Sequence, residues 1–594
     1  MKKVYIYLAI IVVMAVGLFI VSFLYIDRQG RQTFFYAVYH DNVLTGYEKI
    51  DKYLVENKLI YKSSLELPRD MLRQKTMRKM RFDSTGKNLI DYTEETTANG
   101  AKSTVYIKND NNTIAFLGIA DAAFAFLDNI KVLGNFTMFE SGALVTYPPL
   151  VKRYNFKKRG EQFFNTLTAI SPNLPPLAGM VSVTAIGKDV IDIEGKKVRC
   201  DNLVFELSNG DLISVWTAQA FHNVLMVKIP KTGFKAVLCE KRETIPVEEY
   251  VKKSGLYSEK EVMFKNGDIS LSGILSIPNK EENPYPTILL IWDSGPSDNT
   301  AMGMFTDIAH ALAENGYCVF RFDKRGIGKS QGFFSTYDQS EEIADLKKAV
   351  EFLRSVPEVD QSRIAVLGYS EGGFYAAYLT SMDDGIRGCI IISAAVSMNP
   401  AKDDFKKVKE FIKSNITTDS AYLDNVIKSI AKSREITKDK GDWITVLDNS
   451  VFTKKLREQD SYDMIETLKK VKIPVLILHG KKDNINFPEE AREMEDLLSQ
   501  SGNNNFTATY FGDLDHLMGS MVKNNNIRDH IEADASVIKS IISWLDDNLT
   551  LPPLPSATTE STLSETVGEE PQGPQDQETA VPPANSEQNP AISQ

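Results

Sequence analysis

The chain has 594 residues, of which 43% are hydrophobic and 25% charged, so it is long enough for two or three domains with separate cores. The net charge is −11, and the last 44 residues carry seven acidic side chains with no Lys or Arg. Because the rest of the chain is close to neutral, the composition excludes binding of nucleic acid through a basic surface. The four cysteines show no C-x-x-C spacing, so neither a zinc cluster nor a disulfide framework is indicated.

The N-terminus predicts a membrane anchor within residues 1–32. Residues 4–26 are uncharged and mostly apolar, and such a stretch is long enough to cross a bilayer as a helix. Lys2 and Lys3 precede it, so the positive-inside rule favours a cytoplasmic N-terminus and an extracytoplasmic position for the rest of the chain. A signal peptide cleaved near the Ala-Val-Gly at 15–17 is the alternative.

Residues 33–250 predict a mainly antiparallel β domain. Short alternating segments such as NLVFELSNGDLISVW are separated by Gly, Asn and Asp. A few helices are expected among them, for instance near residues 116–132. The rhythm of VIDIEGKKVRCDNLVFEL faintly resembles the curved half-barrel sheets of some bacterial envelope proteins, and the role of the domain stays open.

Residues 258–548 predict an α/β fold, because continuous apolar strands that alternate with helices are typical of a parallel sheet covered on both faces. Strands are expected at 286–292, 317–322, 364–368, 388–394 and 474–479, with helices at 303–315, 340–355 and 371–381. The charged, amphipathic segment 396–470 is expected to be a mostly helical cap inserted over one end of the sheet. Residues 549–594, rich in Pro, Ser, Thr and Glu, are predicted to be disordered.

A candidate nucleophile lies between one of these strands and the next helix. The stretch GYSEG at 368–372 has the G-x-S-x-G pattern, in which small residues form a sharp turn that projects the serine hydroxyl above the sheet edge. A glycine turn with a helix-capping Ser370 would explain the same residues locally. Only the nucleophile hypothesis requires an acid and then a histidine further along the chain.

His516 is the predicted base. Three of the six histidines precede the serine and fall outside the expected chain order, namely His40, His222 and His310. His479 ends a predicted strand and is interpreted as structural. His516 follows the strand-like FTATYF and a loop, whereas His530 lies in a charged stretch that predicts a helix, so the placement favours His516.

Asp483 is the predicted acid, because it follows directly after a strand, at the edge where open α/β sheets place their functional groups. A simple Asx-turn would account for the same residue. Asp513 and Asp515 are rivals close to His516 in sequence, but neighbouring residues rarely point at one another.

Acyl transfer also needs hydrogen-bond donors for the developing oxyanion. The backbone N–H of Glu371, directly after the nucleophile, is one candidate. The second is expected from the loop IWDSGPSDN at 291–299, where Ser294 is the predicted donor through its backbone amide. An ordinary Ser-Gly-Pro turn would explain this loop as well.

Residues 258–548 resemble the α/β-hydrolase superfamily, in particular its cap-bearing serine esterases, with the prolyl-oligopeptidase-like hydrolases as close relatives. The segments that carry the resemblance are DSGPSDN, FRFDKRGIGKSQG, VDQSRIAVLGYSEGG, LILHGKKDNINFP and DLDH. The resemblance implies that Ser370, Asp483 and His516 form a catalytic triad and that Asp323 and Arg325 are structural.

The chain departs from that pattern in the predicted oxyanion loop, where Trp292-Asp293 stands in place of the His-Gly of many relatives. The expected contribution of this loop is a backbone N–H, which any residue type supplies.

These features together predict a membrane-anchored serine hydrolase that cleaves a carboxylic ester or a similar acyl bond through an acyl-enzyme. Its expected substrate is a small-molecule acyl ester, no metal or organic cofactor is implied, and the oligomeric state stays open. One alternative is a serine peptidase of the prolyl-oligopeptidase type. The other is a non-catalytic envelope binding or scaffold protein with a vestigial hydrolase fold, against which the complete and correctly ordered triad argues.

Overall fold

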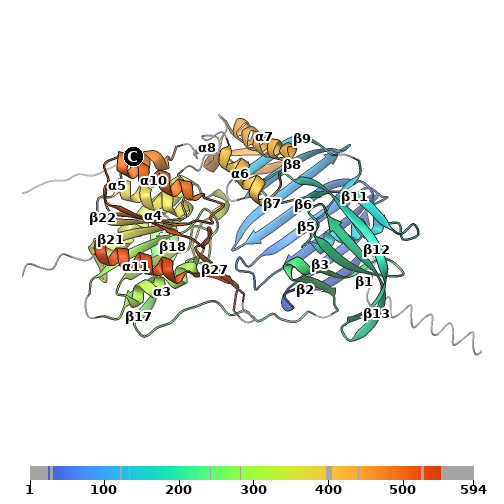
Figure 1. The fold of residues 1–594 in the computed structure, drawn as a ribbon, viewed down its shortest axis with the longest axis horizontal. Coiled ribbons are helices and arrows are strands. Elements are labelled where there is room, and N and C mark those ends of the chain that lie inside the picture. Colours follow the sequence, from blue (N-terminus) through green and yellow to red (C-terminus); the bar gives the residue numbers. More distant parts are fainter. Residues whose placement is uncertain are drawn as a thin grey trace, which may run out of the picture. The chain divides into compact units, whose positions relative to one another are not determined.

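The computed structural model describes residues 25–26, 31–120, 123–132, 134–240, 242–280, 283–396, 405–438, 441–458, 461–523 and 527–549 (Figure 1). The predicted disordered tail at 549–594 lies outside these residues, apart from Leu549.

A sheet of sixteen strands forms the N-terminal part of the chain (Figure 1). Two consecutive series of strands, β2 to β9 and β10 to β16, join where β16 pairs with β2, and every described pair except β10 with β11 is antiparallel. The strands are β1 (Tyr25–Ile26), β2 (Gln32–His40), β3 (Val43–Val55), β4 (Lys58–Glu66), β5 (Lys75–Phe82), β6 (Leu89–Ala98), β7 (Ala101–Asp110), β8 (Thr113–Ala120), β9 (Ala123–Lys131), β10 (Phe136–Met138), β11 (Glu161–Thr168), β12 (Leu177–Ile193), β13 (Lys196–Leu207), β14 (Leu212–Ala218), β15 (Val224–Ile229) and β16 (Phe234–Leu238).

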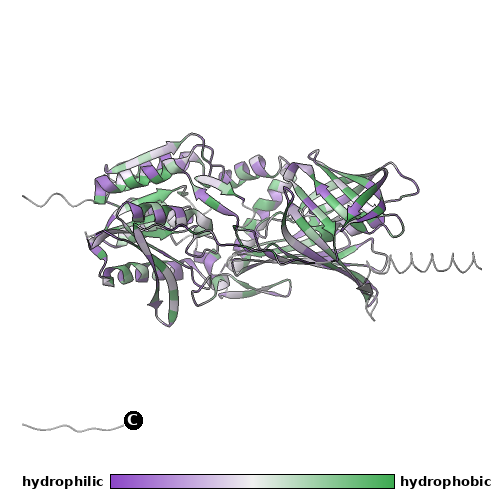
Figure 2. Ribbon diagram, turned by 90° about the horizontal axis from the view of Figure 1, so that it is seen from below, coloured by the Kyte–Doolittle hydropathy of each residue, from purple (hydrophilic) through white to green (hydrophobic). Residues whose placement is uncertain are grey.

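A short helix contributes buried side chains to the hydrophobic core of this sheet. Helix α2 (Tyr147–Arg153) buries Tyr147, Leu150 and Val151 in one cluster with residues from both strand series. Buried and more exposed side chains alternate along strands such as β5, which Figure 2 shows as green and purple bands on the large sheet. The prediction of a mainly antiparallel β domain is therefore confirmed.

The helix expected near residues 116–132 is wrong, because this segment forms β8 and β9. Both faces of these strands are covered. Phe116 and Leu127 pack into the core of the large sheet, whereas Leu117 and Phe126 pack against the later segment around Val446 and Val451. A strand buried on both faces loses the polar alternation that marks a half-exposed one, so its sequence does not differ from that of a buried helix.

The second sheet has eight strands in the order β17-β18-β20-β19-β21-β22-β25-β26, antiparallel up to β20 and parallel from there on. The strands are β17 (Tyr257–Asn266), β18 (Ile269–Pro278), β19 (Tyr285–Ile291), β20 (Cys318–Phe322), β21 (Val359–Tyr369), β22 (Ile386–Ile392), β25 (Val475–Gly480) and β26 (Phe506–Phe511). The helices are α3 (Met304–Glu314), α4 (Gln339–Ser355), α5 (Glu371–Met382), α10 (Pro488–Gln500) and α11 (Ala535–Leu549). The mostly parallel sheet and all three predicted helices of this region are confirmed, and the antiparallel pair β17–β18 is an addition.

The predicted insertion lies between β22 and β25. Its described elements are α6 (Lys406–Asn415), α7 (Ser420–Thr437), the hairpin β23 (Trp443–Val446) with β24 (Asn449–Phe452), α8 (Lys454–Glu458) and α9 (Met464–Leu468). Helix α7 packs on β9, and α9 packs on α5. The segment is thus mostly helical, and it also covers the outer face of β8 and β9, which the sequence did not indicate. A separate hairpin, β27 (Gly519–Val522) with β28 (His530–Ala533), precedes α11.

The predicted membrane-spanning helix at 4–26 lies outside the described residues except for its last two. Tyr25 and Ile26 form β1 and pair with Thr33 and Gln32 of β2, so the helical expectation is wrong for this pair. In the part of the chain that the structure covers, no helix has the length and apolar character needed to cross a bilayer.

Candidate active site

Ser370 lies at the turn between β21 and α5, with φ 54° and ψ −120°. This backbone conformation is rare for L residues and is found where the surroundings enforce it. A Cβ on Gly368 would lie 2.0 Å from the Gly372 carbonyl oxygen, and one on Gly372 would lie 2.2 Å from the Ile291 oxygen. Gly368 is therefore required for the turn to close on itself, and Gly372 for the turn to pack against the end of β19. The Ser370 side chain makes no capping hydrogen bond to α5, so helix capping does not explain it.

Asp483 and His516 meet at the same edge of the sheet. The Asp483 carboxylate has Oδ2 at 2.9 Å from His516 Nδ1, and both side chains are buried. Its other oxygen, Oδ1, accepts the backbone N–H groups of Ile485 and Asn486 at 2.9 Å each. Asp483 thus forms the Asx-turn and also contacts His516, and its role as the orienting acid stays a prediction. The imidazole is held with Nε2 free to act as a base.

The other histidines after Ser370 are held by other contacts. His479, in β25, has Nε2 at 2.8 Å from the Asn486 carbonyl oxygen, in keeping with a structural role, and the same nitrogen lies 3.4 Å from Asp483 Oδ2, further than His516 Nδ1. His530 begins strand β28, so the helix expected around it is wrong, and its ring stacks on Tyr250 with centroids 3.7 Å apart.

The rival acids do not face His516. Asp513 pairs with Lys482 at 2.9 Å, and Asp515 accepts the backbone N–H of Leu517 at 3.0 Å. Both are local loop contacts, which leaves Asp483 as the acid that contacts the imidazole.

Tyr369 is a positioning residue that the sequence did not single out. Its hydroxyl donates to the His516 carbonyl oxygen at 2.8 Å, and its ring stacks on Trp292 with centroids 4.4 Å apart and planes within 9°. The residue directly before Ser370 is therefore tied to the backbone of His516, and Trp292 supports it from the neighbouring strand end. In the sequence, the only indication of this arrangement around Tyr369 was the unusual Trp292-Asp293 pair.

The two predicted oxyanion donors converge on one point. The backbone N–H of Ser294 lies 2.6 Å from Asp293 Oδ1, and that of Glu371 lies 3.3 Å from the same oxygen. Two amides from separate loops thus share one acceptor beside Ser370, as an oxyanion site requires. In this structure the acceptor is a carboxylate of the chain itself.

Buried ion pairs support the loop that carries Asp293. The Lys324 ammonium donates to the Asp293 carbonyl oxygen and forms a buried pair with Glu342 at 2.7 Å. Burial raises the pKa of the Glu342 carboxyl, although the Lys324 ammonium opposes the shift.

Asp323 accepts two hydrogen bonds from Asn299, at 2.7 and 2.8 Å, which agrees with its expected structural role.

Arg325 also makes structural contacts, with Glu341 at 2.6 Å and Asp345 at 2.7 Å. Ser370 follows β21 and His516 follows β26, with β22 and β25 between these two strands in the sheet. Among the described residues, no hydrogen bond joins Ser370 Oγ to the imidazole. Catalytic hydrogen bonds are often long before substrate binds. The residues brought together are thus a strained, buried serine, a carboxylate-held histidine and two convergent amides.

The strand order, the GYSEG turn between β21 and α5, and the Asp483–His516 pair define an α/β-hydrolase segment of the esterase-like kind in the later part of the chain. The protein is a serine hydrolase. Residues 299–518 match the profile of a protein family described as serine aminopeptidase, S33.

Individual proteins match the same segment. The chain is 26% identical over 296 residues to the esterase EstD of Thermotoga maritima, a match that covers 48% of this chain and 68% of EstD. It is 27% identical over 163 residues to the esterase FrsA of Serratia proteamaculans, covering 27% of this chain and 38% of FrsA. A solved esterase of Pyrococcus furiosus aligns with 52% of this chain and 100% of its own at 18% identity and a TM-score of 0.35.

Proposed function

We propose that the protein hydrolyses carboxylic esters of small molecules through an acyl-enzyme formed on Ser370. The observation that carries the proposal is the buried 2.9 Å contact between Asp483 and His516 at the sheet edge where Ser370 is held in its strained turn. A vestigial hydrolase fold has no use for a buried carboxylate–imidazole pair there, since desolvating both groups costs free energy.

The proposed mechanism follows from these positions. Ser370 Oγ attacks the substrate carbonyl carbon while His516 Nε2 takes the hydroxyl proton, and Asp483 Oδ2 holds the Nδ1–H of the imidazole and stabilises its cationic form. The same imidazolium returns the proton to the leaving alcohol. A water molecule then gives a proton to His516 and attacks the acyl carbon, and the imidazolium returns this proton to Ser370 Oγ as the acyl–Oγ bond breaks and the acid leaves. The amides of Glu371 and Ser294 donate to the carbonyl oxygen in each tetrahedral intermediate.

An ester is proposed as the substrate because both EstD and FrsA are named as esterases. The family description, serine aminopeptidase, supports a peptidase as the second candidate, since the same groups also cleave amides.

The test compares p-nitrophenyl esters of increasing acyl length with aminoacyl p-nitroanilides, using the full chain. The proposal expects ester turnover that falls by at least about three orders of magnitude in S370A and H516A. S381A, which changes another serine in α5 where Ser381 bonds only the Tyr378 carbonyl oxygen, is expected to keep wild-type rates. Turnover of anilides alone would favour the peptidase, and ester turnover unchanged in S370A would contradict the proposal.

Membrane anchoring through residues 4–24, the part of the predicted span that precedes β1, with the hydrolase outside the cytoplasm, is also proposed. It is supported by the 21 consecutive uncharged residues and by Lys2 and Lys3 before them.

A further inference from the structure

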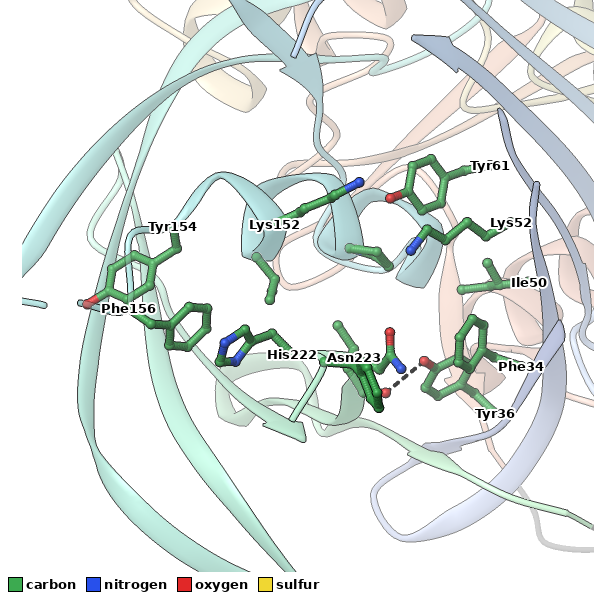
Figure 3. Close-up of a pocket in the computed structure, with 14 residues that line it drawn as sticks. Phe34, Tyr36, Ile50, Lys52, Tyr61, Lys152, Tyr154, Phe156, His222 and Asn223 are labelled. Carbon is green, nitrogen blue, oxygen red and sulfur yellow. Dashed lines mark hydrogen bonds between the residues drawn. The ribbon is translucent and has the colours of Figure 1, made fainter. Parts of the chain in front are cut away.

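A pocket in the large sheet carries a pair of lysines that no described carboxylate neutralises. It lies between β3, β4, α2 and the loop before β15, and its volume is about 140 Å³. Figure 3 shows Lys52 of β3, Lys152 of α2 and the hydroxyl of Tyr61 pointing toward one another at one end of it. None of the lining residues is Asp or Glu.

The rest of the lining is apolar or aromatic. It includes Phe34, Ile50, Pro148, Val151, Phe156 and Phe221. Phe156 stacks on His222 with ring centroids 3.6 Å apart, which fixes the wall opposite the lysines (Figure 3). The pocket therefore has a cationic end and an apolar body.

The Lys52 ammonium lies over the Tyr61 ring, 6.0 Å from its centroid, but the polar groups at the cationic end have no described anion to neutralise them. In the described parts of the chain, neither Lys52 nor Lys152 forms an ion pair, and the hydroxyl of Tyr61, a side chain only 2% exposed, has no hydrogen-bond partner. Burial and the nearby Lys152 ammonium both lower the pKa of Lys52. Lys52 is half-buried and Lys152 is exposed, so water screens part of their mutual repulsion, and an anion bound beside both ammonium groups would relieve the rest.

We propose that this pocket binds a small carboxylate whose apolar body is about the size of a benzene ring. The ammonium groups of Lys52 and Lys152 and the Tyr61 hydroxyl hold the carboxylate, and the aromatic wall holds the body. An apolar cavity of about 150 Å³ accommodates benzene, which sets the size. The proposal is independent of catalysis by Ser370.

The experiment titrates the full chain with benzoate, benzyl alcohol and inorganic phosphate in a calorimeter at pH 7. Benzoate is expected to bind at least about 10-fold more tightly than either of the others, since the alcohol lacks the charge and phosphate lacks the apolar body. K52M and K152M are each expected to weaken benzoate about 10-fold, and Y61F to weaken it several-fold. K157M, which changes an exposed lysine just beyond α2 and outside the pocket, is the matched control and is expected to have no effect.

Several results would overturn this proposal: no benzoate binding, equal binding of benzyl alcohol or phosphate, or affinity unchanged in K52M and K152M. Hexanoate and micellar palmitate distinguish a free short acid from a membrane-derived fatty acid. Hexanoate is expected to bind, and binding of palmitate alone would contradict the size assigned to the ligand.

A second inference concerns Asp293, and it rests on the proposed function. Its Oδ1 accepts from both amides assigned to the oxyanion, Ser294 N–H and Glu371 N–H, at 2.6 and 3.3 Å. Its backbone is held separately, because the Lys324 ammonium binds its carbonyl oxygen. The side chain can therefore rotate about its Cα–Cβ bond while the loop stays in place.

We infer that the Asp293 carboxylate occludes the oxyanion site and that substrate must displace it before Ser370 reacts. A carboxylate oxygen and the oxygen of a tetrahedral intermediate are both negative and require the same two donors, so they cannot occupy the site together. The resting enzyme is thus inhibited by its own side chain.

The test measures the second-order rate constant of labelling by a fluorophosphonate, whose phosphoryl oxygen needs the same donors. D293A is expected to react about 10-fold faster than wild type, with D293N between them because its amide oxygen accepts without a full charge. Thermal melts check that both variants fold. Equal or slower labelling of folded D293A and D293N would overturn the inference alone, whereas absence of labelling in every variant would overturn the proposed function with it.

Discussion

Asp483 performs two tasks with its two oxygens, one in the turn after β25 and one on His516. Oδ1 holds the amides of Ile485 and Asn486, and Oδ2 holds the imidazole. Local turn geometry and catalysis therefore depend on the same side chain, and a substitution can separate them.

D483N is expected to lower kcat for ester hydrolysis by about three to four orders of magnitude with little change in melting temperature. Asn retains an oxygen for the turn amides but presents N–H₂ to His516 Nδ1, which stabilises the wrong tautomer. D483A removes both functions and is expected to lose stability as well. Steady-state kinetics and thermal melts of the two variants make the comparison, and a D483N enzyme within 10-fold of wild type would contradict the assigned role.

Glu140 provides a pH-dependent contribution to stability. It pairs with Arg78 at 3.0 Å, and burial raises the pKa of its carboxyl from 4.5 to about 7, with Arg78 opposing the shift. The folded state thus binds this proton more tightly than the unfolded state. The resulting stabilisation is complete below about pH 4.5 and is lost as the pH rises through about 7.

E140Q removes this titration. Between pH 4.5 and 8, the melting temperature of the wild type is expected to fall by a few degrees relative to E140Q. E206Q, at an exposed carboxylate on β13, is expected to follow the wild type. Parallel melting curves for wild type and E140Q over this range would refute the assignment.

At the residue scale, the sequence predicted the candidate catalytic residues better than the residues that hold them in place. Chain order and strand ends were sufficient to select Ser370, Asp483 and His516. Tyr369 could not be selected, because its contact with the His516 carbonyl depends on the tertiary approach of two loops. The Asp293 carboxylate could not be selected either, because its position beside the two amides depends on how its loop packs against the turn at Ser370.

At the scale of elements, the inserted segment between β22 and β25 covers the edge of the large sheet. Strand β9 is the last of its series, and α7 packs on it. The backbone N–H of Phe126 in β9 donates to Ser433 Oγ of α7 at 2.9 Å in a buried position. An exposed strand edge offers unpaired N–H groups for aggregation, and α7 occupies this one.

S433A is expected to destabilise the protein by about 1–3 kcal/mol, because it leaves the buried Phe126 N–H without an acceptor. Denaturant unfolding measures the change. S414A, at an exposed position in α6, is the matched control and is expected to lie within about 0.5 kcal/mol of wild type. Equal stability of the two variants would show that the edge of β9 does not depend on α7.

The packing of the inserted segment on β8 and β9 also explains why the sequence did not predict these two strands. Strands β8 and β9 are apolar on both faces because the distant hairpin around Val446 and Val451 covers the outer one. The sequence alone does not show that this hairpin packs on β8 and β9. The five strands predicted for the hydrolase sheet, in contrast, were located to within a few residues, since helices that neighbour them in sequence cover both faces of that sheet.

At the scale of the whole molecule, the proposed arrangement is a membrane anchor, a β domain with its own binding pocket and a hydrolase. Strand β2 begins at Gln32 and β17 begins at Tyr257, while the boundaries 33–250 and 258–548 stay predictions.

The anchor is tested by placing charges in its centre. V13D combined with L18D is expected to move the full chain from the membrane fraction to the supernatant after ultracentrifugation, because each Asp at the centre of a spanning helix costs about 2.5–3.5 kcal/mol. S556A combined with S561A, outside residues 4–26, serves as the control and is expected to stay with the membrane. Retention of the charged variant in the membrane fraction would contradict the anchor.

The central claim is that Ser370 is the nucleophile. It is tested most directly by treating the full chain with a fluorophosphonate and locating the adduct by peptide mass spectrometry. The account predicts one adduct on the peptide that contains Ser370 in wild type and S381A, and none in S370A. An adduct on another residue, or equal labelling of S370A, would contradict it.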